Sequence, residues 1–170
     1  MRSECLALVG SGIGVVPGFS RWSSPKLHYG RWSHIGNVYA LTMVCQHRQR
    51  SFDDERCVQI VSRTLRAMDE EGFTASLAWV IMPDHVHWLA QLRTHALGYC
   101  VQRFKARSSY LMNRCRKRSG AVWQPGYYDH AIRSDESLRE QAMYILANPV
   151  RANLAERIGD YPHAWCRWEL

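Results

Sequence analysis

Two apolar runs separated by only two residues constrain the fold of this chain more than any other feature. Residues 74–82 (TASLAWVIM) and 85–92 (HVHWLAQL) are rich in the apolar, β-branched and aromatic side chains that favour strands. Between them stand only Pro83 and Asp84, a pair typical of a tight turn. We therefore predict that the two runs form the arms of one β-hairpin.

Hydrophobic periodicity predicts further elements before and after this hairpin. Residues 36–46 follow the β-branched and aromatic pattern of a first strand. Residues 53–71 place apolar side chains at helical spacing, and Gly72 is expected to end that helix. Residues 95–118 carry a second apolar stripe at helical spacing and predict a long helix.

The C-terminal part of the sequence predicts one more strand and one more helix. Residues 121–134 contain a turn followed by a fourth strand, and residues 135–148 form an amphipathic helix that Pro149 ends soon afterwards. The aromatic tail, with Trp165 and Trp168, is expected to pack back on the body. The order β-α-β-β-α-β-α predicts an α+β fold: a ferredoxin-like (split βαβ), four-stranded antiparallel sheet with an added C-terminal helix.

Charge and composition narrow the class of protein without deciding its function. The chain has 170 residues and a net charge of +7, which favours anionic partners such as nucleic acid. No stretch approaches the roughly 20 apolar residues of a membrane span. The six cysteines form no CxxC pair, so we expect free thiols and a cytoplasmic location. We interpret residues 1–24 as a flexible leader and residues 25–170 as a single domain.

The two histidines of the hairpin are candidates for a metal site. On a strand, residues i and i+2 point to the same face, so His85 and His87 project together. Two neutral imidazoles on one face can share a divalent cation. The alternative is that both are polar side chains on a half-exposed sheet.

The predicted C-terminal helix offers a third ligand and a nucleophile. Tyr144 and Asn148 stand at i and i+4, which places them on one side of a helix. If this helix packs against the histidine face, the amide oxygen of Asn148 can complete a site suited to magnesium or manganese. The alternative for Tyr144 is a core aromatic residue. Tyr110, Tyr127 and Tyr128 are rival nucleophiles, but Tyr127 and Tyr128 are adjacent on a predicted strand and neither has an amide residue four positions on.

Several strings of the sequence resemble one family of mobile-element enzymes. PDHVHW resembles the HUH motif (histidine, bulky hydrophobe, histidine) of single-tyrosine, IS200-like transposases. RFKARSSYLMN, WQPGYYDHAIR and YILANPVRANL then follow in the order seen in REP-associated tyrosine transposases, which act on repetitive extragenic palindromes in bacteria. The similarity runs from about Leu27 to Leu154.

This resemblance implies a role for each candidate residue. His85 and His87 match the metal-binding pair, Asn148 the third ligand and Tyr144 the nucleophile. The implied substrate is single-stranded DNA beside a hairpin, which a bacterial enzyme acting as a monomer or homodimer would cleave and transfer through a 5′-phosphotyrosine. Such a protein would serve DNA transposition and recombination, and would be nucleoid-associated when bound to DNA.

Basic segments are candidates for contacts with that DNA. Arg103, Lys105 and Arg107 lie on the predicted long helix, where the alternative is an ordinary solvated helix face. The string KLHYGRW mixes cations with Tyr29 and precedes the first strand, and Arg31 belongs to it. By resemblance this arm would help to recognise the palindrome; otherwise it is an ordinary lead into the strand.

Two other functions fit the same residues. A ferredoxin-like sheet also serves RNA-recognition modules, so the chain could be a non-catalytic nucleic-acid-binding module. A metallohydrolase that uses activated water is the second alternative. The intact histidine pair together with Tyr144 favours the transferase.

Overall fold

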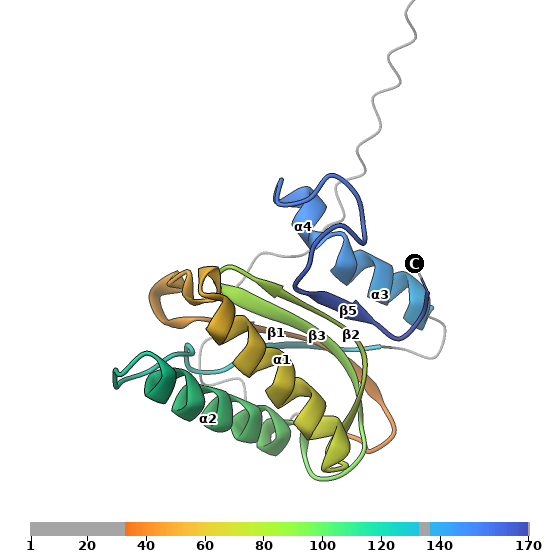
Figure 1. The fold of residues 1–170 in the computed structure, drawn as a ribbon. Coiled ribbons are helices and arrows are strands. Elements are labelled where there is room, and N and C mark those ends of the chain that lie inside the picture. The colour runs from red at the N-terminus through yellow and green to blue at the C-terminus, as the bar shows by residue number, and fades with distance from the viewer. Residues whose placement is uncertain (1–32, 133–136, 170) are drawn as a thin grey trace, which may run out of the picture.

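The predicted hairpin is present with the expected bounds in a computed structural model of the chain, which describes residues 33–132 and 137–169. β2 spans Thr74–Met82 and β3 spans His85–Leu92. The two strands are antiparallel, and Met82 pairs with His85 across the turn. They form the centre of the sheet, between the two helical layers of Figure 1.

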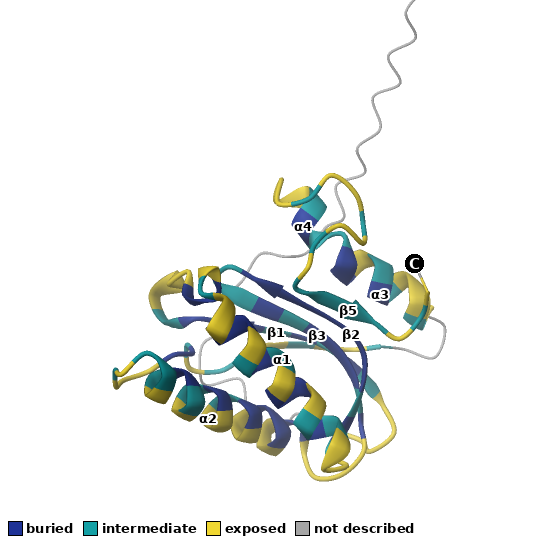
Figure 2. Ribbon diagram, in the orientation of Figure 1, coloured by how far each residue is buried: buried dark blue, intermediate teal, exposed yellow. Residues whose placement is uncertain are grey.

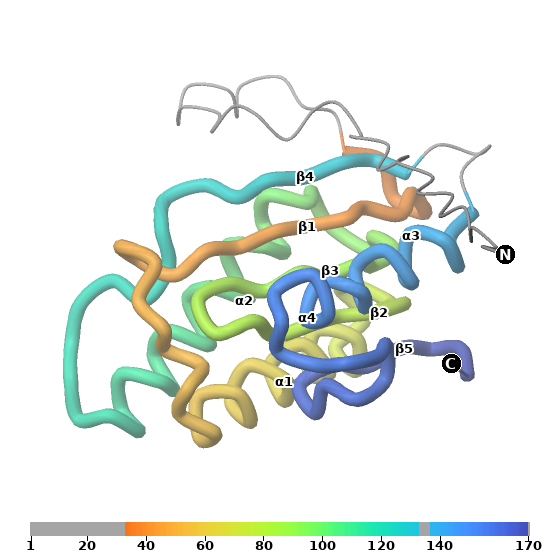
Figure 3. Tube along the Cα trace, turned by 90° about the horizontal axis from the view of Figure 1, so that it is seen from above, coloured from red at the N-terminus to blue at the C-terminus, as the bar shows by residue number. Residues whose placement is uncertain are grey.

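The sheet has five strands in the order β4-β1-β3-β2-β5. The first strand, β1, spans Val38–Val44, and β4 spans Tyr128–Ala131 at one edge. β5, Ala164–Cys166, comes from the aromatic tail and pairs with β2 at the other edge. Figure 3 shows all five strands side by side. The α+β ferredoxin-like prediction is confirmed, with a fifth strand where the sequence indicated only a packed tail.

The helices cover both faces of the sheet. α1 (Glu55–Glu70) and α2 (Leu97–Cys115) pack on one face, and α3 (Leu138–Leu146) packs on the other. Each face has its own apolar core, visible in Figure 2 as buried strands and buried inner sides of helices. The α1–α2 core includes Val61, Leu65, Trp88 and Phe104; the α3 core includes Ala78, Val80, Leu89, Ile145 and Leu146.

The ends of the first two helices follow local chemistry. Asp54 precedes α1, and its side chain accepts a hydrogen bond from the backbone N–H of Arg56 at 3.1 Å, so the helix begins two residues later than expected. Gly72 has φ of +76°, a left-handed conformation that glycine adopts without strain, and the helix ends before it as predicted. α2 ends at Cys115 rather than at residue 118, and Lys117 has a positive φ of 49°.

The predicted helix 135–148 is divided. α3 ends at Leu146, and a short helix, α4, continues from Asn148 to Arg151 after Ala147. Pro149 lies in the first turn of α4, where backbone N–H groups make no hydrogen bond within the helix, so the missing N–H of proline costs nothing there. The predicted helix therefore does end before Pro149, at Leu146 rather than at residue 148, and Pro149 belongs to the start of a separate helix that was not predicted.

The remaining predictions concern the N-terminal leader and arm, the state of the cysteines, and membrane-spanning helices. The leader at 1–24 and the arm residues Tyr29 and Arg31 lie outside the described part of the chain. The five cysteines within it, at positions 45, 57, 100, 115 and 166, are free as predicted. Among the described helices, none is long and apolar enough to cross a membrane.

Candidate metal and tyrosine site

His85 and His87 point to the same face of β3 and meet at their Nε2 atoms, which lie 3.1 Å apart. Their rings are perpendicular, with an interplanar angle of 88° and a centroid separation of 4.7 Å. Two nitrogens at this separation, each about 2.1 Å from a shared cation, would subtend roughly 95° at it. This angle is close to that between neighbouring ligands of an octahedral ion, so the pair fits a divalent metal.

Asp84, in the hairpin turn, supports His85 rather than serving as a third ligand. Its Oδ1 accepts from His85 Nδ1 at 2.5 Å, which leaves Nε2 of a neutral ring with its lone pair. Its Oδ2 accepts from Arg48 Nη1 at 3.1 Å. Burial opposes ionisation of Asp84, but the hydrogen bonds and charges of His85 and Arg48 outweigh it and hold the pKa of the carboxyl below its usual value. Asp84 is therefore an anion that orients the first imidazole.

His87 is held by the neighbouring strand. Its Nδ1 lies 2.9 Å from the hydroxyl of Thr42, the residue that pairs with it on β1. Burial, together with the charges of His85 and Arg151, lowers the pKa of His87 to about 3. The ring is therefore neutral at pH 7, the form that binds metals.

Asn148 is the predicted third ligand. Within residues 33–132 and 137–169 no group of three His, Cys, Asp or Glu side chains converges on a metal position. α3 packs on the histidine face, as the prediction for Asn148 required, and brings that residue to the start of α4. Asn148 Nδ2 donates to the carbonyl of Ile145 at 2.8 Å, and Oδ1 accepts from Arg151 at 2.9 Å. Because a carbonyl oxygen has a second lone pair, the role of Asn148 as a ligand stays a prediction consistent with this geometry.

Tyr144 is not a core residue. It is 47% exposed and lies outside the buried stripe of α3, which consists of Ala142, Ile145 and Leu146. Its hydroxyl makes no hydrogen bond with the described residues, and the Arg151 guanidinium covers its ring at 4.3 Å from the centroid. The phenol is thus accessible to a substrate from solvent.

The rival tyrosines occupy different positions. Tyr110 is exposed on α2, on the other side of the sheet, and Tyr127 packs against the α1–α2 core. Tyr128 on β4 pairs with Thr42 on β1, and Thr42 pairs in turn with His87 on β3. Tyr128 therefore lies on the same face of the sheet as the histidines, and its backbone is two strand spacings, about 10 Å, from that of His87. Tyr128 is 40% exposed and is the natural control for Tyr144.

The basic residues predicted to bind DNA are not brought to the histidine face. Arg103, Lys105 and Arg107 lie on α2, on the opposite side of the sheet. Arg103 donates to Glu71 at 2.8 Å, and Arg107 pairs with the same carboxylate. Lys105 donates to the carbonyls of Gln124, at 3.0 Å, and Gly126. Their roles in DNA binding stay predictions, and any such contact lies apart from the metal and tyrosine site.

Three residues of the site were not predicted from the sequence. Thr42 reaches His87 through strand pairing, and Arg48 reaches Asp84 through the fold of the loop after β1. Arg151 belongs to the string YILANPVRANL, but nothing in its spacing distinguished it from an ordinary surface arginine.

The chain belongs to the IS200-like transposase family, whose model matches residues 35–148. Two relatives place it near one group of that family. A REP-associated tyrosine transposase of Escherichia coli (strain K12) is 28% identical over 134 residues, which cover 79% of each chain. A protein of Haemophilus influenzae assigned to the same group is 28% identical over 148 residues, covering 81% of this chain and 84% of the relative. The resemblance read from the motifs, and the enzyme class that it implied, are confirmed.

Solved structures show the same fold. A REP-associated tyrosine transposase bound to a REP hairpin has a TM-score of 0.66 and 21% identity, and the match covers 80% of each chain. A structure from Deinococcus radiodurans, assigned as a transposase, has a TM-score of 0.51 and 20% identity over 73% of this chain and 95% of that one.

Proposed function

We propose that this transposase cleaves single-stranded DNA beside a hairpin and transfers the strand through a covalent bond between Tyr144 and the 5′-phosphate. The observation that carries the proposal is the histidine pair, with Nε2 atoms 3.1 Å apart, on the face that the Tyr144 helix covers. The REP hairpin bound to the similar transposase of known structure supports DNA as the partner, and so does the net charge of +7.

The proposed reaction exchanges one phosphodiester for another. The phenolic oxygen of Tyr144 bonds to phosphorus while the bond to the 3′-oxygen breaks. The phenol loses its proton to water or a base, and the departing 3′-oxygen takes up a proton to become a hydroxyl. Because the phosphate ester is conserved as 5′-phosphotyrosine, the reverse attack by a 3′-hydroxyl rejoins DNA without ATP.

His85, His87 and Asn148 are the residues that would hold magnesium or manganese. A bound cation of this kind supplies Lewis-acid polarisation of the scissile phosphate. Around it, Asp84 keeps the Nε2 lone pair of His85 directed to the site, and the low pKa of His87 keeps that ring unprotonated at pH 7. A free tyrosine has a pKa of about 10, so this reaction also needs help in removing the phenolic proton.

An adduct assay with matched tyrosine variants tests the proposal. The protein is incubated with labelled single-stranded hairpins from genomic palindromes and manganese, then denatured and resolved on a gel. We expect a covalent protein–DNA band with the wild type and with Tyr128→Phe, and none with Tyr144→Phe. Loss of the nucleophile should reduce adduct formation by at least about a thousandfold.

Three results contradict the transferase. Adduct formed by Tyr144→Phe but not by Tyr128→Phe would identify Tyr128, on β4, as the nucleophile. A gel shift without any adduct would support the non-catalytic binding module. Cleavage that persists without an adduct in Tyr144→Phe would support the metallohydrolase.

A further inference from the structure

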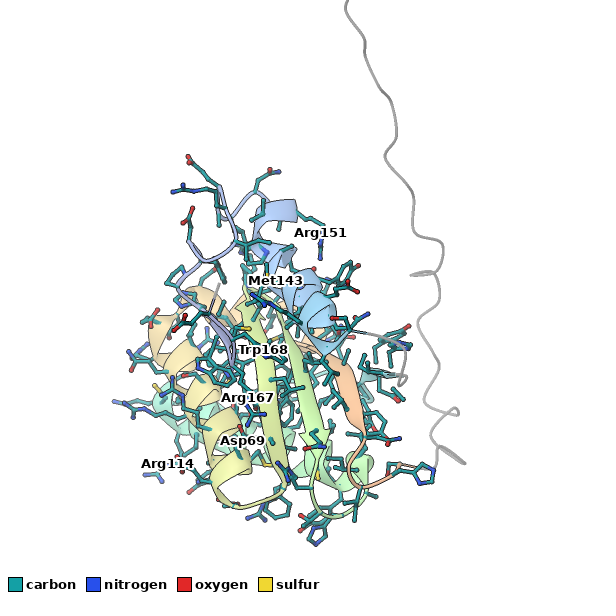
Figure 4. All side chains as sticks on the ribbon, turned by 90° about the vertical axis from the view of Figure 1, so that its right-hand side faces the viewer. Asp69, Arg114, Met143, Arg151, Arg167 and Trp168 are labelled. Atoms are coloured by element: carbon teal, nitrogen blue, oxygen red, sulfur yellow. The ribbon has the colours of Figure 1, made fainter. Side chains whose placement is uncertain are left out.

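Arg151 is in contact with both Tyr144 and Asn148. Its Nη2 donates to the backbone carbonyl of Tyr144 at 2.8 Å and to Oδ1 of Asn148 at 2.9 Å. Its guanidinium carbon lies 4.3 Å from the centroid of the Tyr144 ring. Figure 4 shows Arg151 beside α4, far from Arg114 of α2. One cation therefore touches the proposed nucleophile and the proposed third ligand.

The charge of Arg151 is not neutralised by the described part of the chain. Some other arginines do have carboxylate partners: Arg48 pairs with Asp84, Arg103 with Glu71 and Arg157 with Asp160. No carboxylate of residues 33–132 or 137–169 pairs with Arg151, which is exposed. An unpaired guanidinium at this position is a ready partner for an anion placed between Tyr144 and the histidines.

We propose that Arg151 is a catalytic residue that binds a nonbridging oxygen of the scissile phosphate and stabilises the charge that builds up as Tyr144 attacks. The inference rests on the proposed function of the same site. Nη2 is already committed to Tyr144 and Asn148, so the N–H groups of Nε and Nη1 are those that would face the phosphate. The two anchoring bonds place the donor before the substrate arrives, which is the condition for effective electrostatic stabilisation.

A purely structural role is the competing explanation. The bonds from Arg151 to the Tyr144 carbonyl and to Asn148 also tie α3 to α4 across Ala147. An amide side chain can make such bonds but carries no charge. Arg151→Gln therefore separates the two roles, because it keeps N–H donors while removing the cation.

The test uses substrates that differ only in charge at the cleavage position. After the wild-type cleavage position is mapped by the adduct assay, the same hairpin is synthesised with a methylphosphonate there, and the two stereoisomers are separated. Single-turnover rates of adduct formation are measured for the wild type, Arg151→Gln, Arg151→Lys and Arg157→Ala. The last variant is a control, because Arg157 is 83% exposed at its side chain and pairs with Asp160 in the same C-terminal segment.

With the natural phosphodiester we expect Arg151→Gln to be slower by about a hundredfold or more, the usual loss of one charge-stabilising donor. Arg151→Lys should recover part of this loss, and Arg157→Ala should match the wild type. With one methylphosphonate isomer, which lacks the oxygen that Arg151 binds, Arg151→Gln and wild type should react at equal rates. An equal loss on all three substrates, or full activity of Arg151→Gln, overturns the proposal for Arg151 while leaving Tyr144 in place. Absence of adduct from the wild type overturns the proposed function itself.

Discussion

At the scale of single residues, the histidine pair depends on partners that hold each ring. Arg48 donates a hydrogen bond to Asp84, and Asp84 accepts one from His85. The hydroxyl of Thr42 is hydrogen-bonded to His87. Arg48 has a φ of +51°, a left-handed value that is uncommon outside glycine. The loop that has this conformation comes directly after β1, and it is the loop from which Arg48 contacts Asp84 in the hairpin turn. The network spans two loops and holds both imidazoles in place without a metal ion.

Asp84→Asn tests this arrangement through metal affinity. The amide has nearly the same size but lacks the charge that favours the required tautomer and the pairing with Arg48. We expect the dissociation constant for manganese, measured calorimetrically on the protein without DNA, to rise about 10- to 100-fold. Asp160→Asn, which removes a carboxylate paired with Arg157, is the control and should leave the affinity unchanged. Equal affinities in wild type and Asp84→Asn would show that Asp84 is only a turn residue.

At the scale of elements, the sequence predicts best where the signal is local. The hairpin has the expected bounds because two apolar runs and a Pro-Asp turn define it without any distant partner. β5 has only three residues, Ala164–Cys166, all half-buried, so its sequence shows no alternation of apolar and polar side chains. It forms because its backbone pairs with the edge of β2. The same-face argument predicted His85 and His87 as a pair, but the partners Thr42 and Arg48 are brought in by tertiary contacts that no spacing encodes.

The contacts of Lys105 on α2 are a second example of tertiary contacts that sequence spacing does not predict. The phosphate-binding role predicted for Lys105 stays a prediction; in the structure its ammonium group donates to the backbone carbonyls of Gln124 and Gly126, a contact that the sequence did not indicate. Burial lowers the pKa of Lys105 from 10.5 to about 8. Charged Lys105 therefore costs folding energy at neutral pH, and this cost is relieved as the group loses its proton.

The pH dependence of stability measures that cost. Between pH 8 and pH 10.5, about the folded and unfolded pKa values, the unfolded chain binds more protons than the folded chain, so the free energy of unfolding rises with pH. Relative to Lys105→Met, the wild type should gain about 2 kcal/mol between roughly pH 7 and pH 9.5 in urea unfolding. Lys117→Met, at an exposed position, should show no such pH-dependent difference. A constant difference between wild type and Lys105→Met would mean that the carbonyl bonds fully compensate for burial.

At the scale of the whole molecule, the two faces of the sheet have different roles. The α1–α2 face holds the larger core, including Trp88 and Phe104, whose ring centroids lie 5.7 Å apart. The α3 face holds a smaller core that includes Leu89 and Leu146, and it also carries the imidazoles and Tyr144. Both cores stabilise the fold, but only the second positions α3, which carries the proposed nucleophile Tyr144, relative to the proposed metal ligands His85 and His87.

Two leucine truncations separate stability from positioning. Leu146→Ala in α3 and Leu65→Ala in α1 remove the same atoms from sites with 3% and 0% exposure. Each should lower the free energy of unfolding by about 2–5 kcal/mol, as measured by urea denaturation. At a temperature where circular dichroism shows both variants folded, Leu146→Ala should form the covalent adduct about tenfold more slowly, since small displacements of reacting groups are costly. Leu65→Ala should stay within about twofold of the wild type because its cavity lies on the other side of the sheet. Equal slowing by both variants would mean that adduct formation follows overall stability, and that the packing of α3 on the histidine face has no separate part in placing Tyr144.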